Sequence, residues 1–263
     1  MTNPFKFLLT HAITAIFLLS ATYSNAAHAD GRPTQIDANN RALISVLDPA
    51  GWTAGAQLRF EDRSFSGGPV TDPDAPAPST NVDLRSLTAH FGFSPIGFVR
   101  PWVEAGVAET EGDLGDANPG FIWGLGARAK LFELALEGNR TLPRKATISL
   151  DVDVSLESAE SEVEGTDLSW EEFSIAPRFV YQKDHRGDAQ RFDKLPDGTT
   201  GYIGLRFSDV DVEYAQTDYQ EEENLGLVLG TTLRVSEGFA ADLNATFYGS
   251  DDRSLRIGFN WHF

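Results

Sequence analysis

Apolar and polar residues alternate with a period of two along most of the chain after residue 50. The clearest stretch, residues 146–157, reads ATISLDVDVSLE, in which every second position is apolar and the positions between are polar or acidic. This period is that of a β-strand, whose successive side chains point to opposite faces, and it excludes an amphipathic helix. The chain is therefore predicted to be all-β.

Ten segments carry this pattern, and clusters of turn-forming residues separate them. Each has roughly 10 to 13 residues. A strand of a soluble protein has about 5–6 residues, whereas a tilted strand needs about 9–11 to cross a membrane, so the lengths favour membrane-spanning strands. The predicted strands are 52–63, 82–93, 98–108, 120–130, 145–157, 172–182, 201–212, 225–235, 239–248 and 254–263.

Antiparallel strands of this length close most simply into an up-and-down transmembrane β-barrel. A mean hydropathy of −0.25 does not oppose this fold, because alternation averages the apolar and polar faces. We predict one barrel domain over residues 51–263 with ten strands; eight and twelve are the alternatives. A soluble sandwich or lipocalin-like binder would also alternate, but it would not explain aromatic residues near both strand ends. The segment KLFELALEG, residues 130–138, fits either a lengthened strand or a helical turn.

The first 29 residues have the layout of a cleaved signal peptide. Lys6 precedes an uncharged apolar run over residues 7–21, and the small-x-small triplet of residues 27–29 follows. Residues 30–50 are predicted to form a periplasmic segment ahead of the barrel. The chain has no cysteine, so disulfides cannot stabilise it after export.

The polar face of each strand is predicted to point into the lumen, because a carboxylate that faces lipid near the midplane would cost on the order of a few kcal/mol. This rule places about one arginine per strand inside the barrel, with acidic residues opposite them. Arg85 and Glu61 are expected to join them. The predicted lumen-lining residues are Arg59, Arg100, Glu104, Arg128, Asp151, Asp153, Arg178, Arg206, Arg234, Asp242 and Arg256.

Acidic residues gather in every second connection. Residues 61–83, 109–118, 157–172 and 209–224 hold 23 of the 39 acidic residues, and these connections are expected at the outer surface of the cell. There they would contact lipopolysaccharide, with divalent cations loosely bound between. A net charge of −18 excludes a nucleic-acid partner. Aromatic girdles are expected at both rims: Trp52, Phe91, Phe93, Trp102, Tyr181, Phe239 and Trp261 at one, and Phe60, Trp123, Trp170, Phe173 and Phe247 at the other.

The last strand ends on an aromatic residue. Leu255, Ile257, Phe259, Trp261 and Phe263 alternate with polar residues, which resembles the assembly signal of bacterial outer-membrane β-barrels. Together with RPWVEAGVAE at residues 100–109, the chain resembles the small barrels of the opacity-protein-like class. This resemblance implies the bacterial outer membrane as location, and its lipid and the barrel-assembly machinery as partners.

The sequence favours a non-enzymatic barrel with a structural or surface-interaction role. Beyond the signal peptide the histidines are His90, His185 and His262, all expected in the periplasmic half, where the known barrel enzymes do not keep their general base. No catalytic, cofactor-binding or metal-binding residue is predicted. The alternative is a narrow porin-like diffusion channel lined by the arginines and carboxylates.

Overall fold

The computed structural model describes residues 51–67, 79–94, 98–113, 115, 117–136, 146–185, 197–215, 217–236, 238–249 and 252–263. The predicted signal peptide, residues 1–29, and the predicted segment 30–50 lie outside the described residues. Within the described ranges, no helix has the length and apolarity needed to cross a membrane.

In the described residues, eleven strands form one antiparallel sheet. All ten predicted strands are confirmed, and most run several residues further into the acidic connections than expected. The eleventh, β8, lies within the acidic connection 209–224, where no strand was predicted. The strands are β1 (Gly51–Gly67), β2 (Ser79–Ser94), β3 (Val99–Gly112), β4 (Asn118–Leu136), β5 (Ala146–Val163), β6 (Thr166–Asp184), β7 (Gly198–Tyr214), β8 (Thr217–Glu221), β9 (Leu225–Ser236), β10 (Phe239–Tyr248) and β11 (Asp252–His262).

The sheet closes on itself because β11 pairs with β1, from Thr53↔His262 to Asp62↔Arg253. The resulting ring contains β1–β7 and β9–β11, which are ten strands. We call the end that holds Gly51 and Phe263 the terminal end, and the opposite end, which holds the acidic connections, the acidic end. Closure leaves the ring without an unpaired edge, as a spanning sheet requires.

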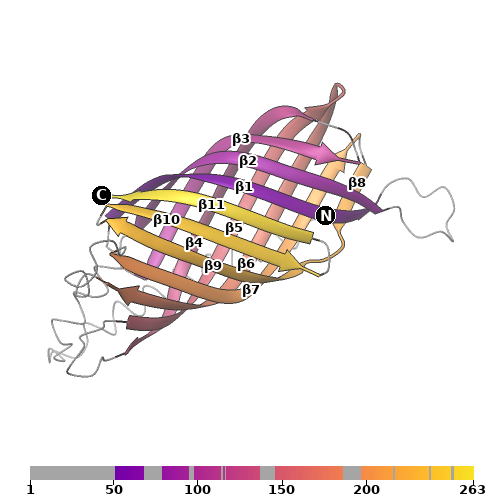
Figure 1. Ribbon diagram of the computed structural model, residues 1–263. Coiled ribbons are helices and arrows are strands. Elements are labelled where there is room, and N and C mark those ends of the chain that lie inside the picture. The colour runs from indigo at the N-terminus through magenta and orange to yellow at the C-terminus, as the bar shows by residue number, and fades with distance from the viewer. Residues whose placement is uncertain are drawn as a thin grey trace, which may run out of the picture. The chain divides into compact units, whose positions relative to one another are not determined.

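Strand β8 changes the strand count at the acidic end. Its residues pair with Asp211–Tyr214 of β7 on one side and with Phe65–Gly67 of β1 on the other. At this level β9, β10 and β11 have ended, so the ring consists of β1–β7 and β8, eight strands in place of ten. Figure 1 shows β8 at the end of the barrel opposite the carboxyl terminus.

The outer surface along the ten-stranded part is apolar, and the inward positions are polar, as the alternation predicts. Large apolar side chains stay exposed on every strand of this ring, although a soluble protein would bury most of them. Such a belt around a closed barrel is the surface that lipid covers. Among its members are Leu58, Leu87, Val103, Leu125, Ile148, Phe179, Ile203, Leu229, Leu243 and Phe259. The fold is that of an outer-membrane β-barrel.

The polarity of the two faces reverses at the acidic end, which the sequence analysis did not predict. On β1 the inward residue is Phe65, whereas the outward neighbours Ser64 and Ser66 are polar. Trp170 points inward and is 1% exposed, so its assignment to an aromatic girdle is wrong. This end therefore has the inside-apolar arrangement of a water-soluble barrel, as expected for strands that extend beyond the lipid.

Two further expectations need correction. Trp102 lines the lumen and does not belong to the girdle at the terminal end. Arg85 lies on the outer face, where its guanidinium pairs with Glu111 at 2.7 Å and its side chain is 52% exposed. It follows the outward parity of Leu87 on β2.

The segment of residues 130–138 is a lengthened strand in its described part. Strand β4 continues to Leu136 after a bulge between Lys130 and Phe132. The bulge shifts the alternation by one residue, so that Phe132 and Leu134 face outward.

Candidate functional site in the barrel lumen

The lumen contains three successive layers between the acidic end and the terminal end. An apolar layer comes first, a buried network of ion pairs lies beneath it, and a polar cavity occupies the remainder. Each layer consists of inward-facing residues from several strands. The inward-facing residues along any one strand therefore belong to different layers. On β1, for example, Phe65 belongs to the first layer and Arg59 and Arg63 to the second.

The apolar layer fills the eight-stranded part of the barrel. The T-shaped contact between Phe65 and Trp170, with ring centroids 5.4 Å apart, crosses this layer. A ring of eight strands leaves an interior that side chains can fill. The members of the layer are Phe65, Val82, Leu84, Ala108, Ala117, Ile122, Ala159, Val163, Leu168, Trp170, Val210 and Val212, with Tyr214 and Tyr219 packed against them.

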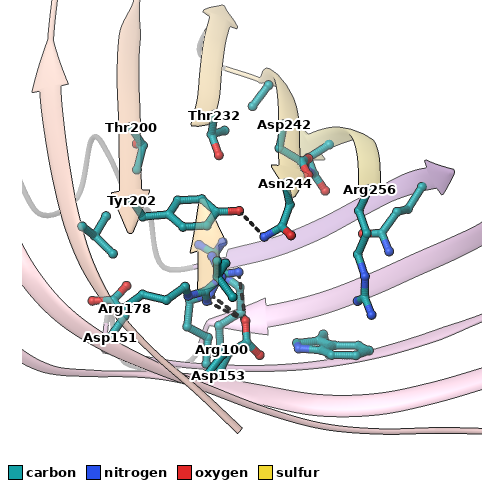
Figure 2. Close-up of a pocket in the computed structure, with 18 of the residues that line it drawn as sticks. Arg100, Asp151, Asp153, Arg178, Thr200, Tyr202, Thr232, Asp242, Asn244 and Arg256 are labelled. Atoms are coloured by element: carbon teal, nitrogen blue, oxygen red, sulfur yellow. Dashed lines mark hydrogen bonds and ion pairs between the residues drawn. The ribbon is translucent and has the colours of Figure 1, made fainter. Parts of the chain in front are cut away.

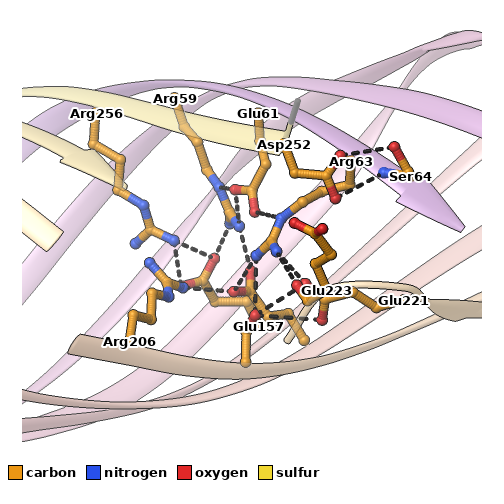
Figure 3. Close-up of polar contacts among 12 residues, drawn as sticks. Arg59, Glu61, Arg63, Ser64, Glu157, Arg206, Glu221, Glu223, Asp252 and Arg256 are labelled. Carbon is orange, nitrogen blue, oxygen red and sulfur yellow. Dashed lines mark hydrogen bonds and ion pairs between the residues drawn. The ribbon is translucent and has the colours of Figure 1, made fainter. Parts of the chain in front are cut away.

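The ion-pair network contains four arginines and four glutamates, so its formal charges balance. Its side chains are almost fully buried; those of Arg63 and Glu172 are 0% exposed. Figure 3 shows the members converging from several strands. They are Arg59, Glu61, Arg63, Glu157, Glu172, Arg206, Glu221 and Arg256.

Arg59 is the centre of the network. Its guanidinium contacts the carboxylates of Glu61, Glu157 and Glu172. Arg206 donates to Glu172 Oε1 at 2.6 Å, and Arg256 donates to Glu157 Oε1 at 3.2 Å. Each of these three glutamates thus has a second arginine, which for Glu61 is Arg63. The second arginine helps to compensate the cost of removing the carboxylate from water.

Arg63 joins the network to the acidic end. It donates to Glu61 Oε1 at 2.8 Å and to the Ser208 hydroxyl at 3.0 Å, and it contacts Glu221 of β8. Its guanidinium also lies over the Tyr248 ring, 3.3 Å from the centroid. The short strand β8 is therefore held by side-chain charges as well as by its backbone pairing.

Sequence reasoning missed Arg63, Glu172 and Glu221 as lumen residues. Arg63 and Glu172 are the end residues of the predicted strands 52–63 and 172–182, but they also fall within the acidic connections 61–83 and 157–172 and were counted with those. The period of two was the available signal. Arg63 lies on the same face of β1 as Arg59 and Glu61, and Glu172 lies on the same face of β6 as Arg178. Glu221 had no such signal, since β8 was not predicted.

A cavity of 260 Å³ lies between the network and the terminal end. It reaches the last inward positions of the strands, at Thr53, Gln182 and His262. Its charged and aromatic lining consists of His90, Arg100, Trp102, Glu104, Arg128, Asp151, Asp153, Arg178, Tyr202, Arg206, Arg234, Asp242, Arg256 and His262.

One wall of the cavity is basic. Arg128 of β4 and Arg178 of β6 both donate to a single oxygen, Asp153 Oδ2, at 3.1 Å and 2.6 Å. Arg100 is the cross-strand partner of Arg128 and points to the same side. Arg178 is buried with its guanidinium 4.9 Å from the centre of the Tyr202 ring, whereas the Arg128 side chain is 43% exposed.

The other wall carries Asp242 of β10 with amide groups beside it. Asn260 donates to Asp242 Oδ2 at 2.6 Å, and Asn244 donates to the Tyr202 hydroxyl at 2.7 Å. Asp242 had been expected to pair with an arginine, but in the described part of the barrel no arginine or lysine forms an ion pair with it. Glu104 likewise accepts from the Thr88 hydroxyl, at 3.4 Å, and not from an arginine.

The structure places all eleven predicted lumen residues on the inward face, but in two groups. Arg59 is part of the ion-pair network alone, and Arg206 and Arg256 belong to the network while also reaching the cavity. The other eight line the cavity: Arg100, Glu104, Arg128, Asp151, Asp153, Arg178, Arg234 and Asp242.

The outer face of the acidic end carries like charges side by side. Asp62 and Asp83 are cross-strand partners, as are Glu171 and Asp211. Partial burial, and then the neighbouring Asp62, raise the pKa of Asp83, and partial burial, followed by Asp209, raises that of Asp211. Among the described residues, however, no group of three or more His, Asp or Glu side chains has the arrangement of a metal site.

Comparison with known proteins finds no matching family model and no matching curated protein. Among solved structures, an outer-membrane channel from Pseudomonas putida F1 is 11% identical, with a TM-score of 0.39 over 82% of this chain and 96% of that chain. The transport unit of the autotransporter AIDA-I from Escherichia coli is 9% identical, with a TM-score of 0.40 over 86% and 96%. The outer-membrane protease OmpT from Escherichia coli is 7% identical, with a TM-score of 0.36 over 81% and 97%.

Proposed function

We propose that this barrel resides in the bacterial outer membrane as a non-enzymatic protein with a closed lumen, and that its role is structural or surface-interacting. The observation that carries the proposal is the pair of layers at the acidic end. An ion and its water shell would have to cross both the buried ion-pair network and the apolar layer, whose described side chains are almost completely buried.

The acidic end is then the surface offered to the environment. Its outward side chains include Glu109, Glu162, Asp167, Asp211 and Asp218. Lipopolysaccharide and the barrel-assembly machinery are the proposed partners. Divalent cations would bind loosely between these carboxylates and lipopolysaccharide phosphates, because the described carboxylates do not converge on a closed metal site.

Single-channel conductance of the refolded chain in a planar bilayer tests this proposal. A heat-modifiable shift in gel mobility first establishes that the barrel has folded, and a porin added to the same bilayer controls for insertion. We expect a folded protein without reproducible conductance steps. Steps whose size depends on the salt concentration would refute the closed lumen.

The second candidate is a diffusion channel that opens at the acidic end. The observation that favours it is the 260 Å³ cavity, whose arginine-rich wall would select among ions if the layers above it moved. The variant Trp170→Ala separates the two candidates, because Trp170 is the largest side chain of the apolar layer. Conductance in this variant but not in the parent chain would show that the layer is the barrier.

A further inference from the structure

The cavity is nearly neutral in total charge, yet its charges are spatially separated. Arg206 and Arg256 donate to network glutamates. Of the remaining charged lining residues, Arg100, Arg128, Arg178 and Arg234 stand against Glu104, Asp151, Asp153 and Asp242, four of each sign. Among these residues Arg128 and Arg178 pair with Asp153, whereas Asp242 forms no ion pair with an arginine or lysine of the described residues.

Two of these charged residues, Arg128 and Asp242, lie on strands at opposite positions of the ring. In the ring of ten strands, β4 and β10 are five strands apart in both directions. Arg128 on β4 and Asp242 on β10 both line the cavity between them. The charges of His90 and then of Arg128 act on Asp242, but Arg128 and Asp242 form no ion pair.

The groups around each charge are suited to a ligand of opposite charge. On the basic side, Arg128 and Arg178 share one carboxylate oxygen of Asp153, so guanidinium N–H groups outnumber the acceptors that they use. On the acidic side, Asp242 accepts one amide N–H from Asn260, and in the described part of the barrel it forms no ion pair with an arginine or lysine. Figure 2 shows Arg178 and Asp153 on one side, Asp242 on the other, and the Tyr202 ring between them.

We propose that the cavity is a binding site for a small zwitterion that carries a carboxylate and an ammonium group. The carboxylate binds the guanidinium of Arg128, whose planar fork matches two carboxylate oxygens. The ammonium binds Asp242. A simple anion would leave Asp242 without a bound cation, and a simple cation would not use the Arg128 N–H groups that Asp153 leaves available. A zwitterion can use both walls at once.

The size of the cavity limits the ligand. Sites for drug-sized ligands have volumes of about 300–1,000 Å³, so 260 Å³ suits a small ligand such as an amino acid of a few carbons. The methylene groups of such a ligand would pass beside Trp102 and Tyr202, which line the same space. This inference goes beyond the closed-barrel proposal and does not depend on whether the lumen conducts.

A set of matched probes tests the inference on the refolded full chain in detergent micelles. Ligand-observed NMR titrations with glycine, β-alanine and γ-aminobutyrate vary the distance between the two charges. Butyrate and butylamine each keep one charge of γ-aminobutyrate and have the same carbon chain. We expect one of the zwitterions to bind about tenfold more tightly than either single-charge probe.

Two variants assign the two ends of the ligand. Asp242→Asn should reduce the affinity for the best zwitterion to that for butyrate, and Arg128→Gln should reduce it to that for butylamine. Asp209→Asn, on the outer face of β7, is the matched control and should leave binding unchanged. Equal binding of butyrate and the zwitterions, an unaffected Asp242→Asn variant, or the absence of binding by any probe in a folded barrel would each overturn the proposal.

Discussion

Arg59 of β1 contacts Glu172 of β6 across the full width of the barrel. The two strands are five positions apart in either direction around the ring of ten, so no other strand could be further from β1. The two residues are 113 positions apart in the sequence. This contact and that of Arg63 with the same glutamate connect opposite walls through buried charges, and Arg206 binds Glu172 from the neighbouring strand β7.

Removing the charge of Glu172 should destabilise the barrel strongly. Glu172→Gln leaves Arg59 and Arg206 buried with less compensation, and breaking a buried ion pair costs about 3–5 kcal/mol. The free energy of unfolding in urea, measured in lipid vesicles, gives the value. Glu171→Gln, one residue away on the exposed outer face, is the matched control. Equal effects of the two changes would show that the network does not stabilise the fold.

The lipid-facing and lumen faces should respond differently to one added arginine. Ile203 is 51% exposed on the outer belt of β7, whereas Thr200 on the same strand lines the cavity. Ile203→Arg should cost about 2–4 kcal/mol of stability in lipid, and Thr200→Arg much less. Refolding yields into vesicles measure both. Greater damage from Thr200→Arg would mean that the inner and outer faces have been assigned in reverse.

Deleting Phe263 should impair assembly in cells more than folding in vitro. Phe263 is 76% exposed and follows β11, so it contributes little packing, while the resemblance to outer-membrane barrels implies that it is part of an assembly signal. The amount of protein in isolated outer membranes is compared with the refolding yield of the purified chain. His262→Gln, which changes the neighbouring inward residue, is the control. Normal membrane levels after deletion would contradict the signal.

Asp83 should make the barrel less stable at neutral pH than at acidic pH. Burial and the neighbouring Asp62 raise its pKa in the folded state above 3.8, so ionisation costs stability. The cost is present above the folded-state pKa and disappears as the pH falls toward 3.8. Asp83→Asn should therefore raise the unfolding midpoint at pH 7 relative to the parent chain, by an amount that shrinks toward about pH 4.

A double variant identifies the cause of this effect. In an Asp62→Asn background, Asp83→Asn should give a smaller gain, because one source of repulsion is already gone. An equal gain in both backgrounds would leave burial alone as the cause.

The sequence predicted the ten-stranded ring because a period of two and long strands are local properties that each segment displays by itself. It predicted the inward arginines for the same reason. It could not predict β8, because residues 217–221 read TDYQE and their strand exists through pairing with two distant strands. Nor could it give the partners of Arg59, or show that Asp242 accepts from Asn260 and not from an arginine, since these contacts depend on the depths at which the strands align.

The reversal of polarity at Phe65 and Trp170 shows the limit of one rule applied along a whole strand. The rule that apolar residues face outward holds only where lipid is the surroundings, and β1 and β6 extend beyond that region. Asp62 and Ser64 on the outer face of β1 were visible in the sequence, and they mark the level at which the rule changes.

The change from ten strands to eight has a consequence for the order in which the chain can assemble. The eight-stranded ring requires only residues up to Glu221, since β8 brings β7 directly to β1. The wider ring cannot close until β11 meets β1 at the other extremity of the chain. The narrow ring can thus fix the register of β1–β7 first. Strands β9–β11 would then insert between β7 and β1, which β8 already holds together.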